Sequence, residues 1–237
     1  MKLFVRLPLL VALIALATLA LSGFGVRLGW WTYAVGFQLL EWSAYAGLAA
    51  GGVAAFTIVV PALRKGVVAS LAVALAIGLV SGYLPWQWRQ QARALPKIHD
   101  ISTDQINPPQ FARILPLRAT APNSSVYGGP EIAAAQKLAY PDIQPHDSAL
   151  APADAFVRAQ ATAKAMGWEI VDADLAAGVI EATATTLWFG FKDDVVIRIT
   201  PAPLGSRIDL RSVSRVGKSD VGANAARIRN YFAKLAT

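Results

Sequence analysis

Leu7–Val26 reads LPLLVALIALATLALSGFGV, a run of twenty residues without a charge that lies between Arg6 and Arg27. Two further uncharged and mostly apolar runs follow, at residues 42–63 and 66–85. At a rise of about 1.5 Å per residue, about 20 helical residues cross a hydrocarbon core of about 30 Å. A backbone in lipid must satisfy its own hydrogen bonds, so each run is predicted to be a helix. The sequence therefore predicts a transmembrane region over residues 1–88, with helices at about 7–26, 42–63 and 66–85.

The first run also fits a secretory signal peptide. Lys2 and Arg6 give it a basic start, and Ala20-Leu-Ser22 before Gly23 is an acceptable cleavage site. The run is long for the apolar part of a signal peptide, which favours a retained helix. Both interpretations place the C-terminal residues on the same side of the membrane.

Basic residues predict the orientation of the helices. Lys2, Arg6, Arg64 and Lys65 would lie together in the cytoplasm, and the first short loop outside would hold only Arg27. Basic residues just after the third run weaken this asymmetry, but long translocated domains largely escape the rule. Three crossings then put residues 89–237 outside the cytoplasm. We expect a multi-pass protein of the plasma (inner) membrane, with its C-terminal domain on the periplasmic side of a double-membrane bacterium.

Membrane lipids are therefore the first expected partners. Trp30, Trp31, Trp42, Trp86 and Trp88 flank the apolar runs, where tryptophan commonly anchors a helix at the membrane–water interface. No charge lies in the middle of a run, so a transporter or proton pump would lack its usual ionisable residue.

Small residues form two stripes in these helices. Gly47 and Gly51 are four residues apart in the second run. In the third run a small residue recurs every four positions, at Ser70, Ala74, Gly78 and Gly82. Small side chains let helix backbones approach closely in lipid. Packing of the second and third helices within one chain is the favoured interpretation, and homo-oligomerisation through either stripe is the alternative.

Composition excludes several kinds of site and partner. The chain has no cysteine, which removes disulfides, iron–sulfur clusters, zinc–thiolate sites and cysteine nucleophiles. Its net charge of +7 divides into +4 on residues 1–88 (5 basic, 1 acidic) and +3 on residues 89–237 (17 basic, 14 acidic). The second part mixes both signs, whereas a nucleic-acid binder would cluster its basic residues. We expect neither nucleic acid nor a cofactor as a partner.

Residues 89–150 hold eight of the fourteen prolines and are predicted to form an extended segment that links the helices to a domain or wraps that domain. One short helix is expected at 130–138, with Pro130 at its first position.

Residues 151–237 predict a membrane-anchored α+β domain. A helix is expected at 152–166, and the last helix has apolar residues at helical spacing from Val221 to Leu235, with Asp220 as its N-cap. Between them, apolar and polar residues alternate, which predicts strands near 168–172, 178–185, 195–199 and 208–211. The order favours a four-stranded antiparallel sheet with helices packed on one face.

The sequence contains no complete catalytic motif. Val216-Gly-Lys-Ser219 resembles the end of a phosphate-binding loop, but Ser212 stands where that motif requires glycine. His99 and His146 lack the spacing of metal ligands. Asp193 and Asp194 are adjacent, so on an extended chain they would point to opposite faces. The sequence therefore predicts no catalytic residue and no metal site.

Three stretches resemble a known family, the bacterial domain of unknown function numbered 1499. They are His99-Asp-Ile-Ser-Thr-Asp104, Trp188-Phe-Gly-Phe-Lys-Asp-Asp-Val195, and the polar stretch from Arg211 to Ile228. The resemblance runs from about residue 99 to 235. Members often carry hydrophobic helices before the domain, and the family has no established activity.

The polar stretch has two interpretations. Arg211 and Arg215 lead toward the start of a helix, whose free N–H groups favour an anion, so the two arginines would form an anion pocket. In the favoured interpretation Arg211 or Arg215 pairs with Asp193 or Asp194 instead, and Asp220 caps the helix. The candidate ligand-binding residues are His99, Asp193, Asp194, Arg211, Arg215, Asp220, Asn224 and Arg227.

The expected function is a membrane-tethered, non-enzymatic module of the cell envelope that binds a partner protein or a small anionic ligand. The alternative is an enzyme that acts on an envelope lipid or glycan through His99, Asp193 and Asp194. Convergence of His99 on either carboxylate at a deep pocket would favour the enzyme.

Overall fold

The structure is a computed structural model that describes residues 2–236, with side chains described from Arg6 onward. The chain divides into two compact units. The first unit joins the residues up to Gln91 with the four residues Leu187–Gly190. The rest of the chain from Ala92 onward forms the second unit.

Three long helices build the first unit: α1 (Lys2–Arg27), α2 (Tyr33–Val59) and α3 (Val68–Ala94). All three are long and apolar enough to cross a membrane. Helix α2 begins nine residues before the apolar run at 42–63, because Thr32 caps it and Tyr45 donates a hydrogen bond to Glu41 within the helix (2.9 Å). At its other end, α2 stops at Val59, four residues before this run ends.

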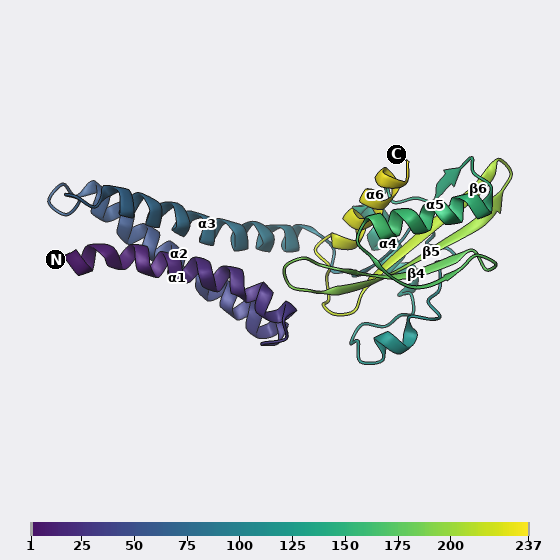
Figure 1. Ribbon diagram of the computed structural model, residues 1–237, viewed down its shortest axis with the longest axis horizontal. Coiled ribbons are helices and arrows are strands. Elements are labelled where there is room, and N and C mark those ends of the chain that lie inside the picture. The colour runs from purple at the N-terminus through teal and green to yellow at the C-terminus, as the bar shows by residue number, and fades with distance from the viewer. Residues whose placement is uncertain (1, 237) are drawn as a thin grey trace. The chain divides into compact units, whose positions relative to one another are not determined.

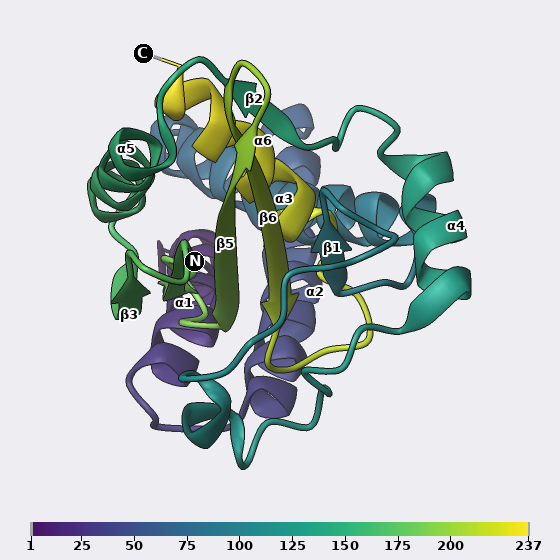
Figure 2. The same ribbon diagram turned by 90° about the vertical axis from the view of Figure 1, so that its right-hand side faces the viewer.

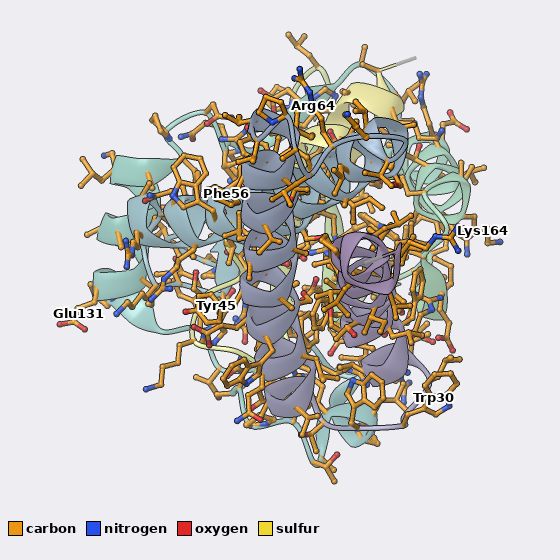
Figure 3. All side chains as sticks on the ribbon, turned by 90° about the vertical axis from the view of Figure 1, so that its left-hand side faces the viewer. Trp30, Tyr45, Phe56, Arg64, Glu131 and Lys164 are labelled. Atoms are coloured by element: carbon orange, nitrogen blue, oxygen red, sulfur yellow. The ribbon has the colours of Figure 1, made fainter. Side chains whose placement is uncertain are left out.

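Figure 3 shows Trp30 and Arg64 at opposite ends of this unit, and Tyr45 and Phe56 projecting outward from α2. These outward side chains are largely exposed in the protein, as is expected of surfaces that face lipid. The helices therefore combine an apolar exterior with an end that carries tryptophan and an end that carries basic residues.

Both small-residue stripes are used within the chain. A Cβ atom built on Gly51 would lie 3.4 Å from the Cα atom of Gly78, and Gly47 faces Ser81. Helices α2 and α3 therefore approach closely along these positions, as small residues allow. Homo-oligomerisation through the stripes stays a prediction.

The second unit contains a six-stranded antiparallel sheet, not the predicted four-stranded one. Its strands are β1 (Asp100–Ser102), β2 (His146–Ser148), β3 (Glu169–Asp174), β4 (Val179–Thr185), β5 (Lys192–Ala202) and β6 (Gly205–Ser214). The order is β1-β6-β5-β4-β3, and β2 also pairs with β6. The two added strands come from the proline-rich segment. Each has three residues, which is too few for an alternating pattern to be recognised in the sequence.

Helices α4 (Gly129–Ala139), α5 (Pro152–Ala165) and α6 (Ala223–Leu235) complete the unit. Helices α5 and α6 pack against one face of the sheet, the helix face, where Ile180, Ile197 and Leu210 meet Phe156 and Ile228 in the main core. Figure 1 shows both helices on this side. Figure 2 shows β1 and β5 on either side of β6.

The opposite face is covered by residues 103–127, which include a short 3₁₀-helix, η1 (Leu115–Arg118). We call this the strap face, and residues 103–127 the strap. Its apolar core is small: Phe111 and Ile114 of the strap pack against Val196 and Val213 of the strands. The rest of the contact is polar, and most candidate residues of the strands lie there.

Candidate functional site

Strand alternation sorts the candidate site residues onto two faces. On β5, Asp193 points to the helix face together with Val195, whereas Asp194 points to the strap face together with Val196. On β6, Arg211 also lies on the strap face, where it contacts Phe111. The eight candidate residues therefore do not form one site, but three separate clusters.

The helix-face cluster forms where the start of α6 meets the ends of β5 and β6. Arg227 forms an ion pair with Asp193 and donates to Ser212 Oγ (2.9 Å) and to Asn224 Oδ1. Asn224 Nδ2 donates to the carbonyl oxygen of His99 (3.0 Å). Ser212 and Asn224 are completely buried. This polar cluster closes the end of the apolar core and fixes α6 against the sheet.

Asp220 stabilises the start of α6, but it is not the N-cap residue. Its carboxylate accepts hydrogen bonds from the backbone N–H groups of Gly222 and Asn224, both at 2.8 Å. The helix begins at Ala223, and Val221 has a left-handed φ of 52° before it. Burial raises the pKa of Asp220 above its ordinary value, and the negative charge of Asp193 adds to this shift.

Asp194 lies at the centre of the second cluster, on the strap face. Its carboxylate accepts hydrogen bonds from Arg118 Nη1 (2.6 Å), from Arg215 Nε and Nη2 (both 2.8 Å) and from Thr183 Oγ1 (2.8 Å). Arg118 comes from η1, so the carboxylate ties the strap to two strands. The pair of Arg215 with Asp194 agrees with the favoured interpretation of the sequence.

Arg211 forms the third cluster, with Asp100 instead of Asp193 or Asp194. Its Nε and Nη2 atoms donate to the two carboxylate oxygens of Asp100, at 2.9 and 2.8 Å. The guanidinium lies 5.2 Å from the ring centre of Phe111 and 5.4 Å from that of Tyr127. Arg211 is 0% exposed. A guanidinium that is enclosed in this way is not available as the cation of an anion pocket beside α6.

Tyr127 has an unusual environment in this cluster. Its hydroxyl is buried and has no hydrogen-bond partner among the residues that the structure describes. Burial raises the pKa of this hydroxyl to about 12. The Tyr127 ring therefore packs against the guanidinium of Arg211, whereas the hydroxyl adds no hydrogen bond to the described residues.

Several charged residues of the strap face were not predicted from the sequence as candidate site residues. Glu181 accepts hydrogen bonds from three consecutive backbone N–H groups, those of Ala112 (2.8 Å), Arg113 (3.0 Å) and Ile114 (2.8 Å). Asp104 and Asp209 share Arg198 and Arg207 in a network of four charges. The alternation of β4 marks Glu181 as a polar-face residue, but nothing in the sequence shows which segment covers that face.

The histidines do not converge on the carboxylates. His99 joins the helix-face cluster through its backbone carbonyl, and its buried Nδ1 atom has no hydrogen-bond partner in the described part of the chain. The ring of His146 stacks on that of Phe232, with 5.2 Å between the ring centres. Among the residues described, no three His, Cys, Asp or Glu side chains are placed to hold a metal ion.

Two pockets border these elements. One of about 260 Å³ lies between α6 and the ends of β3 and β4, and Arg227 and Asn230 contribute to its wall. The other, of about 350 Å³, lies at the end of the sheet where the β3–β4 turn and the last part of β5 meet the start of α5. It has no charged residue in its wall, which is formed by Pro152, Ala153, Leu175, Ala176, Ala177, Gly178, Ile199, Thr200 and Pro201.

Comparison with known proteins identifies the second unit. The family model DUF1499, a protein of unknown function, matches residues 100–235. No curated protein and no solved structure matches the chain. The matched residues run from β1 to the last residue of α6 and include the clusters described above except for His99. Because the match covers more than half of the chain, this protein belongs to the DUF1499 family.

Proposed function

We propose that this protein holds its α+β domain on the periplasmic side of the plasma (inner) membrane, where the domain binds a partner protein of the cell envelope. Three helices that are long and apolar enough to span a membrane support the tether. The basic residues Arg6, Arg64 and Lys65 on one side of these helices support the orientation.

The ion pairs of Asp193 and Asp194 favour a binding protein over an enzyme. A catalytic acid, base or nucleophile needs access to substrate and a partner that positions it. Asp193 is held by Arg227, and Asp194 is held by Arg118 and Arg215, on opposite faces of the sheet. These contacts give each carboxylate a structural role.

The same contacts favour a protein over a small anionic ligand. Arg211 and Arg215 were the cations of the expected anion pocket, and each now has a carboxylate partner on the strap face. An incoming anion would have to displace a buried carboxylate, at the cost of leaving that carboxylate without its partner.

The single observation that carries the proposal lies at the end of the sheet with the larger pocket, which we call the turn end. Leu175 is 54% exposed and lines the pocket, and Leu204 in the neighbouring β5–β6 turn is 90% exposed. Asp154 and Asp174 are exposed beside them. Two exposed leucines beside an apolar pocket give an apolar side chain of a partner a surface to pack against. We expect the partner to offer an apolar side chain with basic residues around it, because its charge would complement these carboxylates.

The test is co-purification of the full-length protein from solubilised native membranes, with quantitative mass spectrometry of what accompanies it. Leu204→Asp should remove the specific partner. Val157→Asp on the outer surface of α5, where Val157 is 62% exposed, is the matched control and should retain it. Exposed substitutions of this kind usually change stability by about 0.5 kcal/mol or less, so melting temperatures should agree.

Two results would overturn the proposal. One is a set of accompanying proteins that is the same for wild type, Leu204→Asp and Val157→Asp. The other is turnover of an envelope lipid or glycan by the wild-type protein that a correctly folded Asp193→Asn variant loses. That second result would establish the enzyme alternative.

A further inference from the structure

The β4–β5 turn carries an apolar tip that groups with the membrane helices. Leu187–Gly190 reads Leu-Trp-Phe-Gly and belongs to the first unit, although the strands on both sides belong to the second. The turn is closed below the tip, where Thr186 N donates to Phe191 O at 2.9 Å and Phe191 N donates to Thr186 Oγ1 at 2.8 Å. The closed turn fixes the base from which the four tip residues project.

Within the first unit, the polar groups of the tip bond to α1. Trp188 Nε1 donates to the carbonyl oxygen of Ala20 at 2.8 Å, and Arg27 Nη1 donates to the carbonyl oxygen of Leu187 at 3.0 Å. Gly190 has a left-handed φ of 67°, and a Cβ atom there would lie 2.9 Å from the Cγ atom of Arg27. Both the turn and the close approach to α1 therefore require glycine at this position.

The rings of the tip join the aromatic residues of the helices. The ring centre of Trp188 lies 5.0 Å from that of Trp88 in α3, and the ring centre of Phe189 lies 5.2 Å from that of Phe37 in α2. Tryptophan gathers at the membrane–water interface because its ring is apolar and its N–H needs a partner. Leu187, beside this group, is 80% exposed in the protein.

We propose that the Leu187–Gly190 tip is a fourth membrane-contacting element, which adds Trp188 to the interfacial tryptophans and inserts the side chain of Leu187 into the lipid bilayer that the three helices span. Lipid is the one occupant that fits, because the exposed leucine is continuous with an aromatic group on helices whose outer surfaces face lipid. The inference rests on the membrane placement of the helices and not on the partner of the domain.

The test uses the absence of cysteine in the chain. Three single variants of the full-length protein, Leu187→Cys, Leu204→Cys and Val53→Cys, are reconstituted one copy per nanodisc of phosphatidylethanolamine and phosphatidylglycerol. Each is labelled with a charged, water-soluble maleimide. The three native side chains are 80%, 90% and 54% exposed in the protein, so without lipid all three thiols would be open to the reagent. Nanodiscs leave both membrane faces open, so the orientation does not affect the result.

We expect the Leu204→Cys thiol to react fast and the Val53→Cys thiol to stay unlabelled. The Leu187→Cys thiol should react roughly tenfold or more slowly than that of Leu204→Cys, because an apolar environment suppresses the thiolate that attacks the maleimide. A fluorophore on the Leu187→Cys thiol should also be quenched by lipids with a nitroxide near the headgroup, which shows that lipid does the shielding.

Equal labelling of Leu187→Cys and Leu204→Cys, with Val53→Cys protected, would overturn the membrane-contacting tip and leave the proposed function intact. Labelling of Val53→Cys at a similar rate would instead overturn the membrane placement of the helices, and with it both proposals. Slow labelling of Leu187→Cys without quenching by the nitroxide lipids would also overturn the tip, because protein would then be the shield.

Discussion

The ring and the hydroxyl of Tyr127 are expected to have opposite effects on the stability of the domain. Its ring lies 5.4 Å from the Arg211 guanidinium, while its buried hydroxyl has no partner. Tyr127→Phe keeps the ring and removes a group whose burial without a hydrogen bond costs about 1–3 kcal/mol. We therefore expect this variant to unfold at the same or a higher urea concentration than wild type.

Tyr127→Ala is the matched comparison. It removes the ring as well, so the guanidinium of Arg211 loses a contact worth about 0.5–2 kcal/mol in addition to the packing. A clear loss of stability in Tyr127→Phe would contradict this account, because it would mean that the hydroxyl makes a contact which stabilises the fold.

The raised pKa of Asp220 predicts how the stability of the domain depends on pH. Burial raises its folded-state pKa above the ordinary 3.8, so the folded protein binds this proton more tightly than the unfolded chain does. The contribution of Asp220 to stability is therefore fully present below pH 3.8 and is lost as the pH rises through the folded-state pKa. Asparagine does not titrate, so Asp220→Asn lacks this dependence on pH. The free energy of unfolding of the wild type should therefore fall relative to that of Asp220→Asn as the pH rises.

Urea denaturation across this pH range measures the effect. Asp220→Ala supplies the control for the cap itself, because losing a capping acceptor costs about 0.5–2 kcal/mol at every pH. A difference between wild type and Asp220→Asn that does not change with pH would show that the carboxyl has its ordinary pKa.

The strap is the element whose attachment can be tested most directly. One carboxylate, that of Glu181, accepts the N–H groups of residues 112–114, and Asp194 holds Arg118 in η1. Glu181→Gln preserves the shape but replaces one charged acceptor oxygen with a donor that faces these N–H groups. Since hydrogen bonds to charged groups contribute about 1.5–3 kcal/mol, the strap should open more often.

Hydrogen exchange reports this opening by residue. Amides 112–114 should exchange faster in Glu181→Gln, whereas amides of α6, on the helix face, should keep the wild-type rate. Equal acceleration in both elements would mean that the strap unfolds only together with the whole domain.

The same elements show what the sequence could predict and why the rest escaped it. Apolar residues recur at every second position around Ile197 and Leu210, so β5 and β6 were predictable, and the apolar spacing of Ile228 and Leu235 predicted α6. Val221 continues that spacing but lies outside the helix, because its left-handed φ breaks the helical backbone. Periodicity reports which side of an element is buried, and it does not report the backbone angle at the end.

The partners of the candidate residues were harder to predict than their faces. Arg211 pairs with Asp100, 111 positions earlier in the chain, and Asp194 pairs with Arg118, 76 positions earlier. Such pairs are set by the path of the strap across the sheet. That path leaves no periodic pattern in a proline-rich segment, so local spacing favoured the nearer carboxylates.

At the scale of the whole molecule, the orientation in the membrane remains the testable consequence of the charge distribution. Arg6, Arg64 and Lys65 are expected inside, with Arg27 alone in the first outer loop. Alkaline phosphatase, which folds only outside the cytoplasm, should be active when fused after Gln91 and inactive when fused after Lys65. A fluorescent protein that needs the cytoplasm should give the opposite pattern at the same two positions.

Replacing Arg64 and Lys65 with glutamine reduces the charge bias that keeps this loop in the cytoplasm, so some of the phosphatase fusions after position 65 should become active. Phosphatase activity after Lys65 but not after Gln91 in the unaltered chain would reverse the orientation and place the DUF1499 domain in the cytoplasm.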